Sequence, residues 1–176
     1  MKWIENPLKK LFILMLIVGI FSFFLGYFFS NPIFAQPNCS LNFWTILATN
    51  SIIHLKLLLF SFLTLGIYSF SFLFTQFFLV GIFVGGITEA RHSLLSALSY
   101  FWIHGIFELS AAILTSIIAP FVCCSLFLLI YKKEISQKKL LKIGKQTVYL
   151  LLISFFLVLF SAFLETFIAP KCVIFI

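Results

Sequence analysis

The chain has 176 residues, of which 62% are hydrophobic, 26 are Phe and only 10% are charged. So little polar surface cannot cover a water-soluble globule, so the composition excludes a soluble enzyme and indicates an integral membrane protein. We interpret the net charge of +7 as a topology signal and expect no nucleic-acid partner. Apolar helices use nearly the whole length, so we expect one all-α membrane domain over residues 1–176.

The first apolar run covers residues 11–29. As a helix its 19 residues would measure about 28 Å, close to the hydrocarbon thickness of a bilayer. It ends in a turn-rich loop that contains Asn31, Pro32, Pro37 and Asn38. The run is longer than the core of a usual secretory signal and more apolar chain follows, so we expect a retained span.

The apolar signal continues with little interruption to residue 169. Residues 43–88 are long enough for two spans, 43–65 and 67–88, joined by a tight turn near Gly66. Gly81 and Gly85 form a small-xxx-small pair that favours close helix packing. Residues 94–130 exceed one span but fall short of two, so we expect a short interfacial or re-entrant segment near 94–103 before a helix over 105–130. A last span over 147–169 stops at Pro170. We therefore expect five transmembrane helices.

The lysines predict the orientation of these helices. Nine of the twelve basic residues flank two loops, three of them before the first span and six in residues 131–145. Five spans place both loops on the same side, and loops rich in lysine are cytoplasmic. We expect a multi-pass protein of the cell membrane with its N-terminus in the cytoplasm and its C-terminus outside.

Polar side chains from several segments should meet in the outer leaflet. His104 and Glu108 lie four residues apart in FWIHGIFEL, and Glu165 occurs in the last span. Further polar residues in the other spans are Asn50, His54, Gln76 and Glu89. Ionisable groups inside a membrane are costly unless paired, so they face the bundle interior and are candidate functional residues. They can equally hold helices together through interhelical hydrogen bonds, and spacing does not separate a binding or partner-docking cluster from such packing.

Two chemical hypotheses remain open for this cluster. His104, Glu108 and Glu165 supply enough ligands for a divalent metal such as zinc together with a water molecule, and would make an intramembrane hydrolase or peptide ligase with one Glu as general base. The sequence has no HExxH motif and no Asp. The same carboxylates could instead serve a proton- or cation-coupled transporter. Cys39 and Cys172 both fall on the expected outer side, where they could form a disulfide.

One known family has a similar order of motifs. Asn50 opens an apolar helix, Gly81, Gly85 and Gly86 follow, and HGIFEL with His104, Gly105 and Glu108 precedes Glu165 and Pro170. Over about residues 41–172 the chain resembles the stage II sporulation protein M (SpoIIM) family. Ser51 and Gln76 stand where that pattern often has Asn.

The resemblance implies a five-helix membrane protein that works through partners. Sporulation members of the family are regarded as membrane anchors for peptidoglycan-degrading enzymes. Short relatives occur beside an ATPase subunit in gene clusters for circular bacteriocins, where they serve maturation, export or immunity. We therefore expect a non-enzymatic membrane component that assembles with peptidoglycan hydrolases, or with a bacteriocin precursor and an ATPase subunit, and a homodimer is left open.

Overall fold

The protein folds as a bundle of long α-helices. The structure, a computed structural model, describes residues 7–31, 42–91, 93–133 and 135–167, but not the side chains of Arg91 and residues 96–104. Its helices are α1 (Pro7–Phe28), α2 (Phe43–Leu63), α3 (Ile67–Arg91), α4 (Leu94–Tyr131) and α5 (Gln137–Phe167). Each of the five contains a stretch long and apolar enough to cross a bilayer. The expected all-α class with five candidate membrane spans is confirmed.

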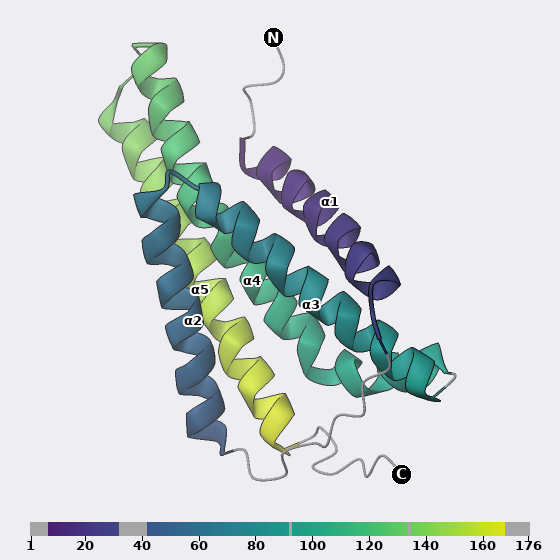
Figure 1. Cartoon of the computed structure of the whole chain (residues 1–176). Coiled ribbons are helices and arrows are strands. Elements are labelled where there is room, and N and C mark those ends of the chain that lie inside the picture. Colours follow the sequence, from purple (N-terminus) through teal and green to yellow (C-terminus); the bar gives the residue numbers. More distant parts are fainter. Residues whose placement is uncertain (1–6, 32–41, 92, 134, 168–176) are drawn as a thin grey trace.

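Helix α4 is the centre of the bundle. It contacts each of the other four helices, while α1 packs mainly against α3, and α2 packs against α3, α4 and α5. Figure 1 shows α4 running between the other helices. Met15 of α1, Leu73 of α3 and Ile117 of α4 are buried together in the main apolar cluster. Most other apolar side chains of α1, α2 and α5 are exposed, as expected for surfaces that face lipid tails.

Small residues bring the backbones of α1 and α3 together. A Cβ atom added to Gly26 would overlap the carbonyl oxygen of Phe78, and one added to Gly81 would overlap the carbonyl oxygen of Phe23. About one turn before Gly26 and Phe78 in the two helices, the buried Ser22 hydroxyl donates to the carbonyl oxygen of Phe74. The close packing expected around Gly81 is therefore confirmed, and its partner is α1.

The turn between α2 and α3 is as tight as expected. Helix α2 ends at Leu63 and α3 begins at Ile67. Leu65 and Gly66 have positive φ angles of 53° and 97°. A Cβ atom on Gly66 would lie 2.9 Å from Cγ of Pro120 in α4. Glycine therefore permits both the positive φ angle and the close contact with Pro120.

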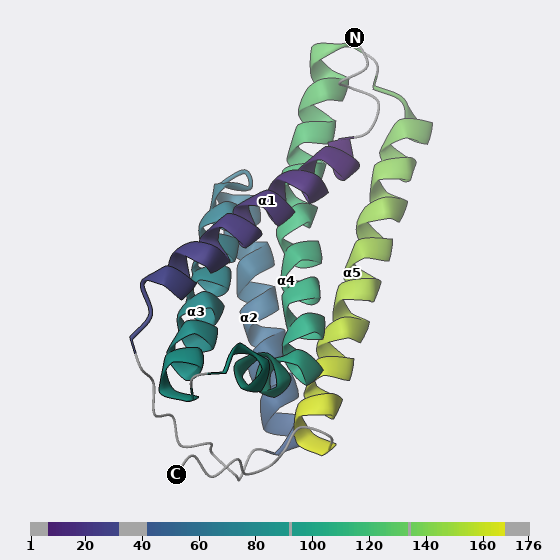
Figure 2. The ribbon, with the colours of Figure 1, turned by 90° about the vertical axis from the view of Figure 1, so that its right-hand side faces the viewer.

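The first turns of α4 have a different direction from the rest of the helix. In Figure 1 they lie across one end of the bundle, and in Figure 2 they are seen almost end-on before the chain turns to run along the bundle. The stretch of α4 that can cross a membrane begins only at Gly105. The arrangement fits the interfacial or re-entrant segment expected near residues 94–103.

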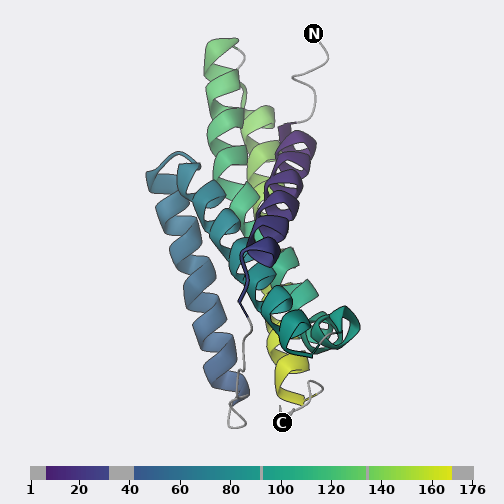
Figure 3. The ribbon, with the colours of Figure 1, turned by 45° about the vertical axis from the view of Figure 1, so that its right-hand side comes forward.

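Helix α5 begins ten residues before its expected span. It starts at Gln137 and has 31 residues, about 46 Å of helix, against about 30 Å of hydrocarbon. Lysine and leucine are good helix formers, so the lysine-rich segment continues the helix instead of forming a loop. With the last turns of α4 it forms a hairpin at the same end of the bundle as the start of α1 (Figures 1 and 3).

Candidate functional site

Four of the polar residues expected to cluster line one cavity between α2, α3 and α4. The cavity has a volume of about 80 Å³, enough for two or three water molecules at roughly 30 Å³ each. Its polar lining consists of Asn50, His54, Gln76 and Glu108, and its remaining lining of Ile53, Phe72, Val80, Gly105, Leu109 and Ala112. Three helices that are far apart in sequence therefore present polar groups to a single space.

Local helix geometry explains this convergence. Asn50 and His54 are four residues apart on α2 and share a face. On α4, Gly105, Glu108 and Ala112 recur at the spacing of one helical face. Gly105 is buried and has no side chain, so it leaves room beside the carboxyl group of Glu108.

Most of the polar lining has no hydrogen-bond partner in the part of the chain that the structure describes. Among the described side chains, which exclude Arg91 and residues 96–104, those of Asn50, Gln76 and Glu108 have no hydrogen-bond partner. Unpaired polar groups in a membrane-spanning bundle are costly unless water or a ligand satisfies them. The cavity is therefore a place where a bound group would gain several hydrogen bonds.

His54 is held by a chain of hydrogen bonds across three helices. Its Nδ1 lies 2.8 Å from Oγ1 of Thr115 in α4, which lies 2.5 Å from Oγ of Ser154 in α5. Ser154 donates to the carbonyl oxygen of Ala111 at 3.3 Å. Each hydroxyl has one proton, so Ser154 accepts from Thr115, and Thr115 accepts from Nδ1–H of His54. This direction leaves Nε2 of His54 with a free lone pair.

Thr115 and Ser154 are site residues that the sequence did not single out. Both hydroxyls lie in strongly apolar segments, where Ser and Thr commonly bond neighbouring helices. Thr115 follows Glu108 by seven residues, which places both on one face of α4. That spacing is the signal that could have identified Thr115.

The acidic residues differ in their positions. Glu165 of α5 interacts electrostatically with Glu108 of α4 but does not line the cavity. The same two helices are in contact through the rings of Phe107 and Phe160, which pack edge to face with centroids 4.8 Å apart. Glu89, near the end of α3, is exposed and lies outside the cavity lining.

The metal and disulfide hypotheses concern side chains that the structure does not describe. The backbone of His104 is helical, but its side chain is among those left undescribed, and Cys39 and Cys172 also lie outside the described residues. Among the described side chains, no group of three His, Cys, Asp or Glu residues could hold a metal ion. The set His104, Glu108 and Glu165 therefore stays a hypothesis.

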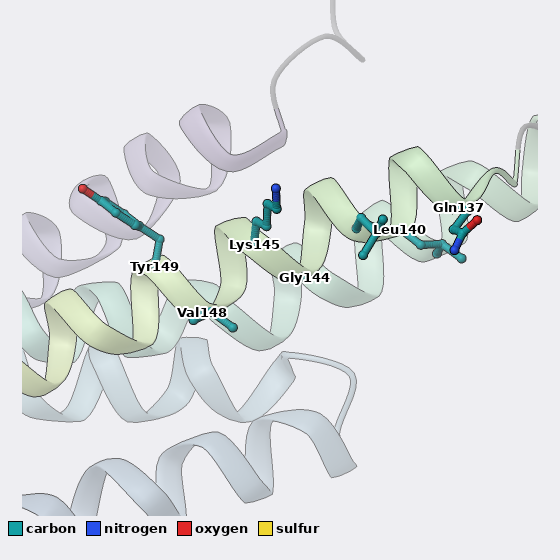
Figure 4. A pocket seen from close by; sticks show the side chains of 7 residues that line it. Gln137, Leu140, Gly144, Lys145, Val148 and Tyr149 are labelled. Atoms are coloured by element: carbon teal, nitrogen blue, oxygen red, sulfur yellow. The ribbon is translucent and has the colours of Figure 1, made fainter.

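A second hollow lies on the lysine-rich part of α5. Figure 4 shows it along one face of the helix, with Gly144 at its centre and Lys145 and Tyr149 beside it. It has a volume of about 730 Å³ and is otherwise lined by Gln137, Leu140, Leu141 and Val148. These residues come from α5 alone, so this hollow is a surface groove, and the cavity between α2, α3 and α4 is the better candidate site.

Comparisons with known proteins relate the chain to one family. A family model described as stage II sporulation protein M matches residues 10–170. An uncharacterised protein of Methanocaldococcus jannaschii is 32% identical over 139 residues, which cover 77% of this chain and 75% of that protein. No solved structure matches significantly.

Proposed function

We propose, since the chain belongs to the stage II sporulation protein M (SpoIIM) family, that it is a non-enzymatic membrane component that assembles with partner proteins. The partners are envelope-remodelling enzymes such as peptidoglycan hydrolases, or the maturation, export and immunity complex of a circular bacteriocin with its precursor and ATPase subunit. The cavity between α2, α3 and α4 receives a polar group of the partner.

One observation carries this proposal: the polar cavity is lined by groups that the described part of the chain does not satisfy. Asn50, Gln76 and Glu108 face it without a hydrogen-bond partner from the described residues. A polar side chain from another transmembrane helix would gain these hydrogen bonds in a medium where water cannot easily replace them. Docking there would couple assembly to a few specific residues.

The orientation that we infer places this cavity where envelope enzymes work. Lys9 and Lys10 lie in the first turns of α1, and six further lysines lie on the α4–α5 hairpin at the same end of the bundle. We assign that end to the cytoplasm by the positive-inside rule. Glu108 then lies towards the outer leaflet.

Partner capture tests the proposal. The tagged protein is purified from its native membranes in mild detergent, and co-purifying proteins are quantified for wild type, Glu108→Gln and Lys145→Gln. We expect Glu108→Gln to lose at least tenfold of the captured partner, while Lys145→Gln, which changes an exposed residue at the opposite end, captures as wild type does. A Glu108→Gln protein that captures its partner fully and still fails in the cell would contradict an assembly role.

A second candidate function follows from two carboxyl groups, one on α4 and one on α5, that lie within electrostatic reach of each other. Glu108 and Glu165 interact electrostatically, and carboxyl groups can act as general acid or base or bind a catalytic metal ion. This candidate is an intramembrane hydrolase or peptide ligase. About one equivalent of zinc in protein purified without chelator, lost in Glu165→Gln, together with peptide processing that needs both residues, would favour it over assembly.

A further inference from the structure

We propose that the cavity between α2, α3 and α4 binds one monovalent cation or one primary ammonium group. This inference rests on the proposed function, because it specifies the chemistry of the polar group that the cavity would receive from a partner. It concerns Asn50, His54, Gln76 and Glu108, which line the cavity from three helices.

The atoms that the cavity presents are mainly acceptors. Glu108 offers two carboxylate oxygens, and the amides of Asn50 and Gln76 each offer one carbonyl oxygen. The hydrogen-bond chain through Thr115 and Ser154 takes up Nδ1–H of His54 and leaves Nε2 as a further acceptor. These oxygens and one nitrogen suit a cation, which needs several lone pairs directed at it.

The charges around the cavity also favour a cation. Among the side chains that the structure describes, no lysine or arginine lines it, and Lys56, two residues after His54, is exposed. Glu165 adds a second negative group within electrostatic reach of Glu108. Two ionised carboxylates repel each other, and a positive charge beside one of them offsets that repulsion. An anion would meet only the amide N–H groups.

The size of the cavity restricts the ligand. A volume of about 80 Å³ is far below the roughly 300–1,000 Å³ of pockets that take organic ligands. It fits a sodium or potassium ion with one or two waters, or the ammonium end of a lysine or a peptide N-terminus. Phe72 is part of the wall, and an aromatic face adds attraction for such ions. With one carboxylate in the lining, a monovalent ligand matches the charge better than a divalent one.

Thermal unfolding of the purified protein tests this inference. The protein is held in mild detergent at constant ionic strength while choline chloride, whose cation is too large for the cavity, is replaced by sodium, potassium or methylammonium chloride. We expect at least one small cation to raise Tm, and at 100 times its Kd to lower the unfolding equilibrium constant about 100-fold. Glu108→Gln should lose this response. Glu89→Gln, which removes an exposed carboxylate outside the cavity, should keep it.

A second variant guards against misfolding of Glu108→Gln. Gln76→Leu removes one carbonyl oxygen at similar volume, and we expect it to unfold cooperatively in choline and to need at least tenfold more of the cation. Equal Tm values for wild type in choline and in all small cations would overturn the inference. So would a cation response that Glu108→Gln and Gln76→Leu both retain.

The same experiment separates the two sources of the positive charge. A response to sodium or potassium assigns the site to a free ion, whereas a response to methylammonium alone assigns it to an amine of a partner or peptide. Loss of partner capture in Glu108→Gln without any cation response in wild type would keep the proposed assembly and reject the cation. A cation response in wild type together with full partner capture by Glu108→Gln would support the cation site and reject the proposed role of the cavity in assembly.

Discussion

Replacing Thr115 by valine should destabilise the bundle through the loss of two interhelical hydrogen bonds. The Thr115 hydroxyl is buried and joins Nδ1 of His54 at 2.8 Å to Oγ of Ser154 at 2.5 Å. Valine has nearly the same volume, so the change removes the hydroxyl and leaves little new space. The perturbation is thus confined to the link between α2, α4 and α5.

The expected magnitude follows from what such bonds contribute in membranes. Interhelical side-chain hydrogen bonds average about 0.6 kcal/mol and reach about 1.7 kcal/mol. Two bonds therefore give a loss of about 1 to 3 kcal/mol in the free energy of unfolding. This corresponds to an increase of roughly 5- to 150-fold in the unfolding equilibrium constant.

Equilibrium unfolding in mixed micelles, as the fraction of denaturing detergent rises, measures this loss. Thr75→Val is the matched control, because the exposed Thr75 hydroxyl donates only to the carbonyl oxygen of Ser71 in its own helix. We expect the control to change the free energy of unfolding by less than about 0.5 kcal/mol. If both variants unfold at the same detergent fraction as wild type, the chain from His54 to Ser154 does not stabilise the bundle.

Other substitutions test further parts of the fold. Gly81→Ala should lower the free energy of unfolding by about 1 to 3 kcal/mol, because its Cβ meets the backbone of α1. The control Gly144→Ala, with nothing within 4 Å of the new atom, should leave the free energy of unfolding unchanged or raise it by up to about 1 kcal/mol. A larger loss in Gly144→Ala than in Gly81→Ala would contradict the α1–α3 packing. Ser69→Ala should cost about 0.5 to 1.5 kcal/mol in the same unfolding assay, because the buried Ser69 hydroxyl donates to Ser61 at 2.7 Å. In a variant whose four native cysteines are replaced by serine, a cysteine at Ile135, on the α4–α5 hairpin, should react with an impermeant thiol reagent only after cells are opened, and labelling of intact cells would reverse the orientation that we infer.

The helices were predictable, although the apolar signal is nearly continuous, because charged and turn residues mark where one span ends and the next begins. Gly66 marks the turn between two helices. Residues 94–130 exceed one span but fall short of two, which indicated that the first turns of α4 differ from its membrane-spanning part. Asn50, His54, Gln76 and Glu108 were expected to converge because ionisable and amide groups avoid lipid and must face a common interior. These four residues line one cavity in the structure.

Helix pairing could not be predicted from the same pattern. Nearly every face of α1 is apolar, so hydrophobic periodicity does not show which side meets α3. The contact depends instead on Gly26, Ser22 and Gly81. The sequence marked Gly81 as a packing position, but its partners on α1 are known only when both helices are placed. For the same reason Thr115 and Ser154 were missed, since a hydroxyl in an apolar helix can bond its own backbone as easily as a neighbour.

The glycine contact between α1 and α3 has a consequence for how the protein is synthesised. Gly26 is about 55 positions ahead of Gly81 in the sequence, which is roughly 3 to 11 seconds of translation at 5–20 residues per second. Throughout that interval α1 has left the ribosome, but the surface that fits its glycines does not yet exist. Helix α2 must enter the membrane during the same interval, and it must leave the glycine-containing face of α1 free for α3. The bundle is therefore completed out of chain order, and α1 reaches its final neighbour only after the third helix has been inserted.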